Sequence, residues 1–149
     1  MNSTKYENIR LSSVGGYFFW TGVWSELSLP NCTYITTCAF GRMTKLTSIT
    51  LPWSKITVIG QSAFGSNTLL QLDSIECPIC SYVGSNAFSS CLGLTEVNFS
   101  TATTIYTSAF TGCLNLKYAN FPSATTIQPY AFHNCQKLIS AYFGAATTI

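Results

Sequence analysis

The sequence IYTSAFTGCLNLKYANF at residues 105–121 returns 22 residues later as IQPYAFHNCQKLISAYF at residues 127–143. Both copies carry a β-branched residue, an Ala-Phe pair, a cysteine and a leucine at the same spacing. The Ala-Phe pair occurs five times in the chain, with its phenylalanines 24, 24, 22 and 22 residues apart. Such a period is the signature of a solenoid, in which each repeat buries its apolar face only against its neighbours.

Two further positions keep their register around every Ala-Phe pair. A β-branched residue stands five positions before each phenylalanine, and a leucine stands six positions after it. Because the frame holds on both sides of the pair, the repeat extends over most of the chain. The β-branched residues are Ile35, Ile59, Val83, Ile105 and Ile127, and the leucines are Leu46, Leu70, Leu94, Leu116 and Leu138.

Each repeat also contains a segment with the two-residue alternation of a half-buried strand. In the segment 106–115, apolar residues three to four positions apart predict a short helix or turn that packing must hold. The predicted fold class is therefore an α/β repeat in which strand, turn and short helical segment alternate. Six strands are predicted, with the inward pairs Leu27/Leu29, Ile49/Leu51, Ile75/Cys77, Val97/Phe99, Ala119/Phe121 and Ala141/Phe143.

The pattern I-x-x-x-A-F-x-x-C-x-x-L-x-x-V-x-F, as it runs through 105–121 and 127–143, resembles the BspA-type leucine-rich repeat of surface proteins in bacteria, protozoa and some phage. The resemblance covers residues 26–149. It implies a leucine-rich-repeat solenoid with a parallel concave β-sheet and short helices or turns on the convex side. It also implies adhesion or ligand binding without catalysis.

The chain is predicted to form a single solenoid domain over residues 1–149. Residues 1–25 do not hold the frame and are interpreted as an N-terminal cap or degenerate repeat, with Trp20 and Trp24 anchoring it to the core. Residues 26–149 contain five to six repeats of 22–24 residues, the last one incomplete. The insertions in the longer repeats fall in connections. The sequence supplies no C-terminal cap, which leaves an open edge. We expect that either the native protein continues or something else covers this end, with self-association of the chain as one way to cover it.

Composition excludes several classes of protein. Of the 149 residues, 47% are hydrophobic and only 8% are charged, which does not fit a disordered chain. A net charge of +2 is too small to predict binding to nucleic acid. No apolar run approaches the roughly 20 residues of a membrane helix, so no membrane insertion is expected. The first fifteen residues contain no signal peptide.

The cysteines are the sharpest candidates for chemistry. Cys91, Cys113 and Cys135 recur three residues after the Ala-Phe phenylalanine and are interpreted as a buried structural ladder. Cys77 and Cys80 have the C-x-x-C spacing; a structural role is favoured, with a disulfide or a metal site as the alternatives.

Catalysis lacks the residues that it needs. The chain has one histidine, His133, which falls at a variable surface position, and no paired-carboxylate or phosphate-loop motif accompanies it. We therefore predict that the protein is not an enzyme and has no catalytic residues, cofactor or metal.

The outward positions of the strands are the predicted binding surface, because successive repeats lay equivalent positions side by side. This face should be acidic at its centre and aromatic toward the C-terminus. We expect a non-catalytic adhesion module on a cell surface or in the extracellular space that binds a protein or glycan. The alternative is a structural segment of a larger surface protein or phage particle. The predicted partner-binding residues are Glu76, Glu96, Asn98, Tyr118, Asn120 and Tyr142.

Overall fold

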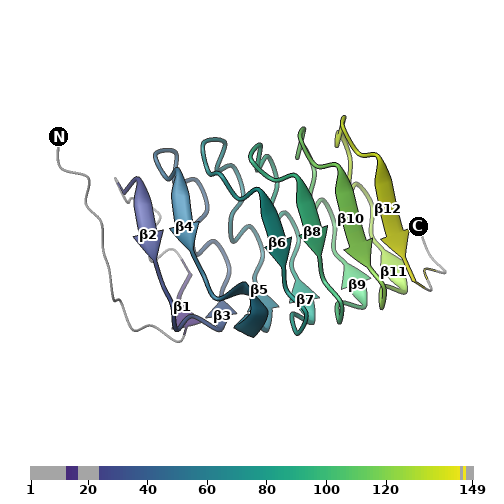
Figure 1. Ribbon diagram of the computed structural model, residues 1–149, viewed down its shortest axis with the longest axis horizontal. Helices are drawn as coiled ribbons and strands as arrows, with labels where there is room; N and C mark the ends of the chain where they lie inside the picture. The colour runs from purple at the N-terminus through teal and green to yellow at the C-terminus, as the bar shows by residue number, and fades with distance from the viewer. Residues whose placement is uncertain (1–12, 17–23, 145, 147–149) are drawn as a thin grey trace.

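The computed structural model describes residues 13–16, 24–144 and 146. Over these residues the chain winds into a stack of similar turns that lie side by side along the long axis of the molecule (Figure 1). Each complete turn contributes one strand of three or four residues to one face and a two-residue strand to another. The first set comprises β2 (Glu26–Ser28), β4 (Ser48–Thr50), β6 (Ser74–Glu76), β8 (Glu96–Asn98), β10 (Tyr118–Phe121) and β12 (Ser140–Phe143). The second set comprises β1 (Ser13–Val14), β3 (Tyr34–Ile35), β5 (Val58–Ile59), β7 (Tyr82–Val83), β9 (Thr104–Ile105) and β11 (Thr126–Ile127).

The six predicted strands are confirmed as the longer set, and their outer surface is called the long-strand face below. Strands β6, β8, β10 and β12 form one parallel sheet, and β2 pairs in parallel with β4. Strands β4 and β6 begin 26 residues apart, because the chain between them holds extra residues. Some of these form η1 (Trp53–Lys55), a 3-10 helix. The insertions therefore lie in connections, as predicted.

The shorter strands form a second parallel sheet that the sequence analysis missed. Its order is β1-β3-β5-β7-β9-β11, and the recurring β-branched residues stand opposite one another in its ladder. Two-residue strands are too short to show an alternating pattern, so the residues appeared only as repeat markers. Val14 pairs with Ile35 in β3, which extends the ladder into the N-terminal segment. Trp24 lies half-buried against the core, whereas Trp20 lies outside the described residues.

Of the predicted short helices or turns, the structure shows the turns and does not support the short helices. Across the described residues η1 is the only helix, and the segments around the Ala-Phe pairs are turns. Alternate N–H groups donate to the next repeat, as the Phe64 N–H does to the Ala87 carbonyl at 2.7 Å. Those between them donate to the residue three positions back, as the Ala63 N–H does to the Gly60 carbonyl at 3.3 Å. Two residues per repeat also adopt positive φ, such as Asn86 at 56° and Ser90 at 58°. A residue in the left-handed conformation interrupts an α-helix. The turns around the Ala-Phe pairs therefore form a hydrogen-bonded ladder between successive repeats, in addition to the two sheets.

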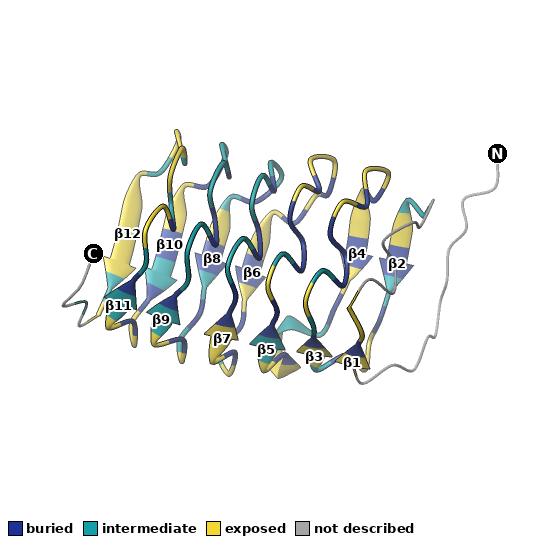
Figure 2. Ribbon diagram, turned by 180° about the vertical axis from the view of Figure 1, so that it is seen from behind, coloured by how far each residue is buried: buried dark blue, intermediate teal, exposed yellow. Residues whose placement is uncertain are grey.

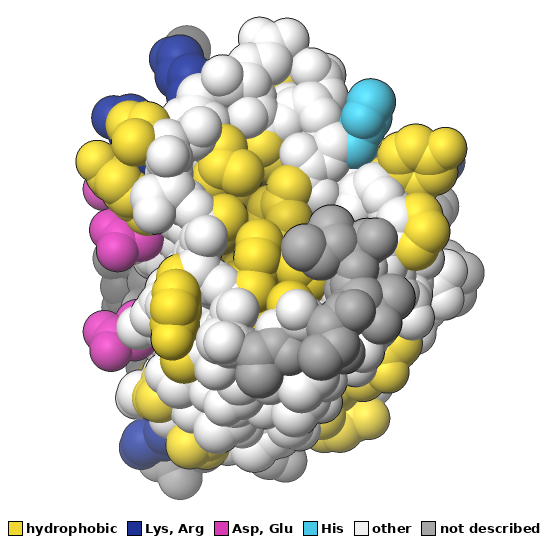
Figure 3. All heavy atoms as spheres, turned by 90° about the vertical axis from the view of Figure 1, so that its right-hand side faces the viewer, with side chains coloured by type: hydrophobic (Ala, Val, Ile, Leu, Met, Phe, Trp, Pro, Cys, Tyr) yellow, Lys and Arg dark blue, Asp and Glu magenta, His cyan; other side chains and the backbone are white. Residues whose placement is uncertain are grey.

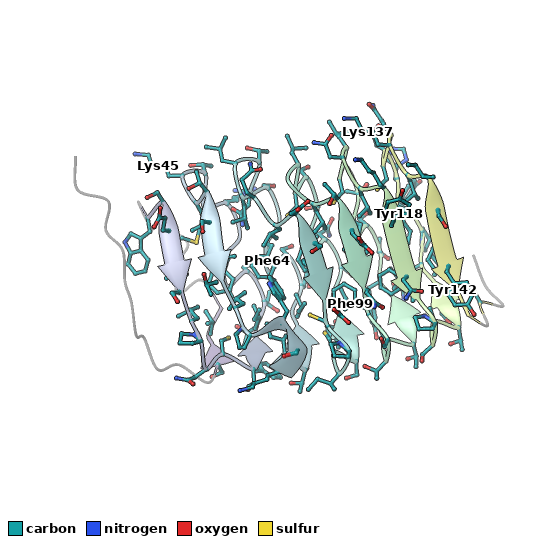
Figure 4. The ribbon with its side chains drawn as sticks, viewed as in Figure 1. Lys45, Phe64, Phe99, Tyr118, Lys137 and Tyr142 are labelled. Atoms are coloured by element: carbon teal, nitrogen blue, oxygen red, sulfur yellow. The ribbon has the colours of Figure 1, made fainter. Side chains whose placement is uncertain are left out.

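The core is built from stacked phenylalanines. The Ala-Phe phenylalanines form one column, in which Phe88 lies 5.2 Å from Phe64 and 5.4 Å from Phe110, with nearly parallel rings. A second column begins at Phe99, which stacks on Phe121 at 5.4 Å. Phe64 and Phe99 both point into the interior in Figure 4. The repeat therefore places equivalent rings at one strand spacing, where each covers the next.

The core is less covered at its C-terminal side. Ala119 is 3% exposed, whereas its counterpart Ala141 is exposed, and Phe143 is only half-buried. Ala141 therefore departs from its predicted buried role, because among the described residues β12 has a neighbouring strand only on the β10 side. Figure 3 views this side of the molecule and shows hydrophobic side chains gathered at its centre.

Candidate binding surface

The long-strand face brings all six predicted partner-binding residues together in two rows. Parallel pairing aligns Glu76 with Asn98, Asn98 with Asn120, and Asn120 with Tyr142. The neighbouring row contains Glu96 paired with Tyr118. Because side chains alternate across a strand, both rows point away from the core while the residue between them is buried. Figure 2 shows this alternation as exposed and buried bands along the long strands.

The side chains of the two rows change along the stack from acidic to aromatic. Glu76 and Glu96 are exposed beside a hollow of about 220 Å³ that Ser74 and Asn98 also line. Toward the C-terminus Tyr118 is 46% exposed and Tyr142 is 58% exposed (Figure 4). The predicted acidic centre and aromatic C-terminal part are thus confirmed.

The asparagines form a ladder between these two regions. Asn120 donates through Nδ2 to Oδ1 of Asn98 at 3.0 Å, and both side chains are half-buried. A hydrogen bond between neighbouring strands fixes the two amides before any partner arrives, which lowers the entropic cost of binding. The surface therefore combines carboxylates, a preorganised amide pair and exposed aromatic rings, a composition suited to recognition rather than to catalysis.

A second polar hollow lies where the long strands begin, and the sequence analysis missed it. It measures about 540 Å³ and includes Asp73, Asn115, Lys117 and Lys137 in its lining. Lys137 donates through Nζ to Oδ1 of Asn115 at 2.8 Å. The register of the loops before each strand could have found this cluster, because these residues occupy equivalent positions one or three residues before successive strands. The hollow adds positive charge beside the acidic rows.

The predicted cysteine ladder is confirmed. The Cys91 thiol donates to the Phe64 carbonyl at 3.3 Å, and the Cys113 thiol donates to the Phe88 carbonyl at 3.1 Å. Cys135 continues the series with a bond to the Phe110 carbonyl at 3.2 Å, but it is half-buried and not buried as predicted. Burial raises the pKa of Cys113 to about 12 and that of Cys135 to about 11. Because the thiolate is the reactive form, these raised pKa values disfavour reaction of the thiols at neutral pH.

Asn67 occupies the ladder position in the repeat before Cys91, and the sequence analysis did not single it out. It is fully buried, and its Nδ2 donates to the Phe40 carbonyl at 2.7 Å. Its Oδ1 has no hydrogen-bond partner. An amide therefore replaces the thiol as donor but brings a buried acceptor that the site does not satisfy.

The C-x-x-C pair takes the structural role favoured above. Cys77 and Cys80 are both buried free thiols, and Cys80 donates to the Tyr82 carbonyl at 3.3 Å. Burial raises the pKa of Cys80 to about 11 and places that of Cys77 higher still. Within the described ranges no three His, Cys, Asp or Glu side chains gather as metal ligands. His133 is exposed, as predicted for a surface position.

This architecture defines a parallel β-solenoid repeat protein with a polar and aromatic long-strand face. The family model of the BspA type leucine rich repeat region matches residues 12–139 in six copies. The chain therefore belongs to the BspA-type leucine-rich repeat family. This family is generally non-enzymatic and typically takes part in protein interaction.

A solved structure supports the same fold. The crystal structure of a leucine rich cell surface protein from Faecalibacterium prausnitzii matches with a TM-score of 0.57 and 23% sequence identity. The match covers 78% of this chain and 41% of that protein, so the present chain spans less than half of its length. No curated protein matches the chain significantly. For the residues that the structure describes, no helix is long and apolar enough to cross a membrane.

Proposed function

We propose that the protein is a non-catalytic adhesion module displayed at a cell surface, and that it binds a protein partner through the long-strand face. The proposal is carried by the two aligned rows that contain Glu96, Asn98, Tyr118, Asn120 and Tyr142. These side chains project from paired strands, so the relative positions of their Cα atoms are fixed by the register of the sheet. Their surface joins an acidic hollow to exposed aromatic rings within four neighbouring strands.

A protein partner suits this surface better than a small ligand. The acidic hollow, at about 220 Å³, is smaller than most small-molecule pockets, whereas the two rows of side chains extend over four strands. Tyrosines next to asparagines provide large contact area with few rotatable bonds, and tyrosine is frequent among interface hot spots. The lysine-containing hollow at the beginning of the strands adds a flanking charge of opposite sign, which favours orientation of a partner.

The test is to probe arrays of extracellular-matrix proteins and glycans with the intact chain. For any protein retained, Tyr118→Ala and Tyr142→Ala are expected to weaken binding at least about 10-fold, the effect of a moderate interface hot spot. Tyr34→Ala removes an equally exposed tyrosine from the other sheet and serves as the matched control. Binding that survives both long-strand substitutions, or retention of glycans alone, would exclude the proposed protein-binding face.

A second proposal concerns the C-terminal side of the stack, which we propose pairs with another copy of the chain. Ile139, which is 69% exposed, directly precedes β12, the half-buried Phe143 ends this strand, and among the described residues β12 pairs with β10 alone. An unpaired strand edge beside apolar side chains is a template for association. Light scattering over a wide concentration range should show the molar mass rising, and Ile139→Lys should suppress the rise. A constant monomeric mass would refute this pairing.

A further inference from the structure

The short-strand sheet carries its own row of exposed side chains, separate from the long-strand face. Strands β3, β5 and β7 align Tyr34 with Val58 and Val58 with Tyr82 on their outer surface. Tyr34 is 44% exposed and Tyr82 is 36% exposed. The two tyrosines flank a groove of about 480 Å³, called the tyrosine groove below. Its remaining lining residues are Ile35, Thr36, Thr37, Val58, Gly60 and Gln61.

The tyrosine groove is rigid. A Cβ added to Gly60 would lie 2.4 Å from the carbonyl carbon of Thr36, so the neighbouring turn occupies the place of a side chain. The Tyr82 ring packs against Tyr106 with centroids 4.8 Å apart, which restrains its rotation. Neighbouring parallel strands lie about 4.8 Å apart, so the Cα atoms of Tyr34 and Tyr82, which are two strands apart, lie about 10 Å from each other. The restrained Tyr82 ring therefore loses little entropy when a ligand binds.

The lining of this groove selects an uncharged ligand. Among the described residues that line it there is no Lys, Arg, His, Asp or Glu, in contrast to the hollows with Glu96 or Lys137. Its exposed polar groups are the Thr37 hydroxyl and the Gln61 side-chain amide, which can both donate and accept hydrogen bonds, whereas the Thr36 hydroxyl already donates to the Val14 carbonyl at 2.8 Å. Thr37 and Gln61 are exposed, so these groups are open to solvent.

The backbone beneath the groove also restricts the mode of binding. Strands β3, β5 and β7 are each paired on both sides within the sheet. A peptide therefore cannot join them as an added strand, which is the usual way in which sheets capture extended chains. Recognition has to use ring faces and neutral polar side chains. A sugar ring matches both, because it presents an apolar C–H face and a rim of hydroxyl groups.

We propose that the tyrosine groove binds a neutral, linear oligosaccharide. Sugar rings lie against Tyr34 and Tyr82, and hydroxyl groups between them bond to Thr37 and Gln61. Val58 forms the apolar floor between the two rings. The proposal concerns a different sheet from the long-strand face, so either binding function can fail without the other.

The test titrates the intact chain with neutral oligosaccharides of four to six hexose or N-acetylhexosamine units, followed by calorimetry. Tyr34→Ala and Tyr82→Ala should each lower the affinity at least about 10-fold, because each removes one stacking platform. Tyr34→Phe should retain most of the affinity, since the ring face is kept. Tyr118→Ala, on the long-strand face, is the matched control and should leave it unchanged.

Thermal unfolding of each variant separates a lost contact from a lost fold. Tyr34 is exposed, so its substitution should leave the unfolding midpoint close to that of the parent protein. The proposal is overturned if no neutral oligosaccharide binds, or if Tyr34→Ala and Tyr82→Ala bind as well as the parent. Binding restricted to sulfated glycans or to proline-rich peptides would also overturn it, because each requires a different chemistry.

Discussion

Replacing Phe88 by alanine tests whether the phenylalanine column holds the solenoid together. Phe88 is fully buried, and its ring stacks on Phe64 at 5.2 Å and on Phe110 at 5.4 Å, with interplanar angles of 6° and 5°. It also lies 6.3 Å from Phe99 of the second column. Removing this ring therefore opens a cavity that touches both columns and two neighbouring repeats.

The expected loss is large relative to the stability of a small domain. A buried Phe→Ala substitution costs about 3–5 kcal/mol, and each aromatic pair contributes about 0.5–1.5 kcal/mol beyond its buried area. Because two stacked pairs disappear, we expect Phe88→Ala to lie near 5 kcal/mol. Natural domains have a total stability of about 5–15 kcal/mol, so the variant should fold with much lower stability or not fold at all.

Phe132→Ala is the matched comparison. Phe132 belongs to the same column and stacks on Phe110 at 5.4 Å, but it is half-buried, and among the described residues no equivalent ring stacks on its outer side. Its loss should be about half as large, roughly 2 kcal/mol, since less surface and one fewer column neighbour are involved. The two variants delete identical atoms, so their difference isolates the position within the stack.

Urea unfolding monitored by circular dichroism measures both free energies of unfolding. Each curve should be recorded in the far and near ultraviolet, because a repeat array can unfold in parts and the two signals then separate. If Phe88→Ala lowered the free energy of unfolding by less than about 2 kcal/mol, or if Phe132→Ala lowered it as much as Phe88→Ala does, the core would not depend on the stacked column. In that case the hydrogen-bond ladders would carry the stability instead.

Three further predictions concern single positions. Asn67→Cys should raise the free energy of unfolding by about 1 kcal/mol in urea titrations, because a thiol can still bond the Phe40 carbonyl without leaving a buried acceptor unsatisfied. Gly84→Ala should destabilise the fold by more than about 2 kcal/mol, since the added Cβ would lie 2.6 Å from the backbone nitrogen of Gln61; thermal unfolding measures this loss. Burial raises the pKa of Cys113 to about 12, whereas an unfolded thiol ionises near pH 8.5. The stability is therefore complete below about pH 8.5 and declines as pH rises toward 12, and Cys113→Ala should show a shallower decline when urea titrations at pH 8 and pH 10.5 are compared.

Much of the fold could be predicted from residue spacing because a solenoid repeats one local problem. Each long strand was located from alternating residues such as Val97 and Phe99, and parallel stacking follows once each repeat can be covered only by its neighbours. The residues of the long-strand face followed from the same alternation. Glu96 and Tyr118 are adjacent in space because they occupy equivalent positions in successive repeats.

The segments around the Ala-Phe pairs could not be predicted in the same way. Apolar spacing there resembles a helix, yet residues such as Ser62 and Asn86 have positive φ, with values of 52° and 56°. Serine has no intrinsic preference for that conformation, so it is imposed by hydrogen bonds to the next repeat. Local propensity cannot report a bond whose partner lies more than twenty residues away.

Periodicity in the sequence determined the solenoid, the register of its long strands and the order of residues along each row, since all three depend on equivalent positions recurring. Only the tertiary structure decided which rows border a hollow. The tyrosine groove needs Tyr34 and Tyr82 from different repeats, a small residue at Gly60 and open neutral groups between them. Those conditions concern distances and space between turns, and a one-dimensional pattern contains neither.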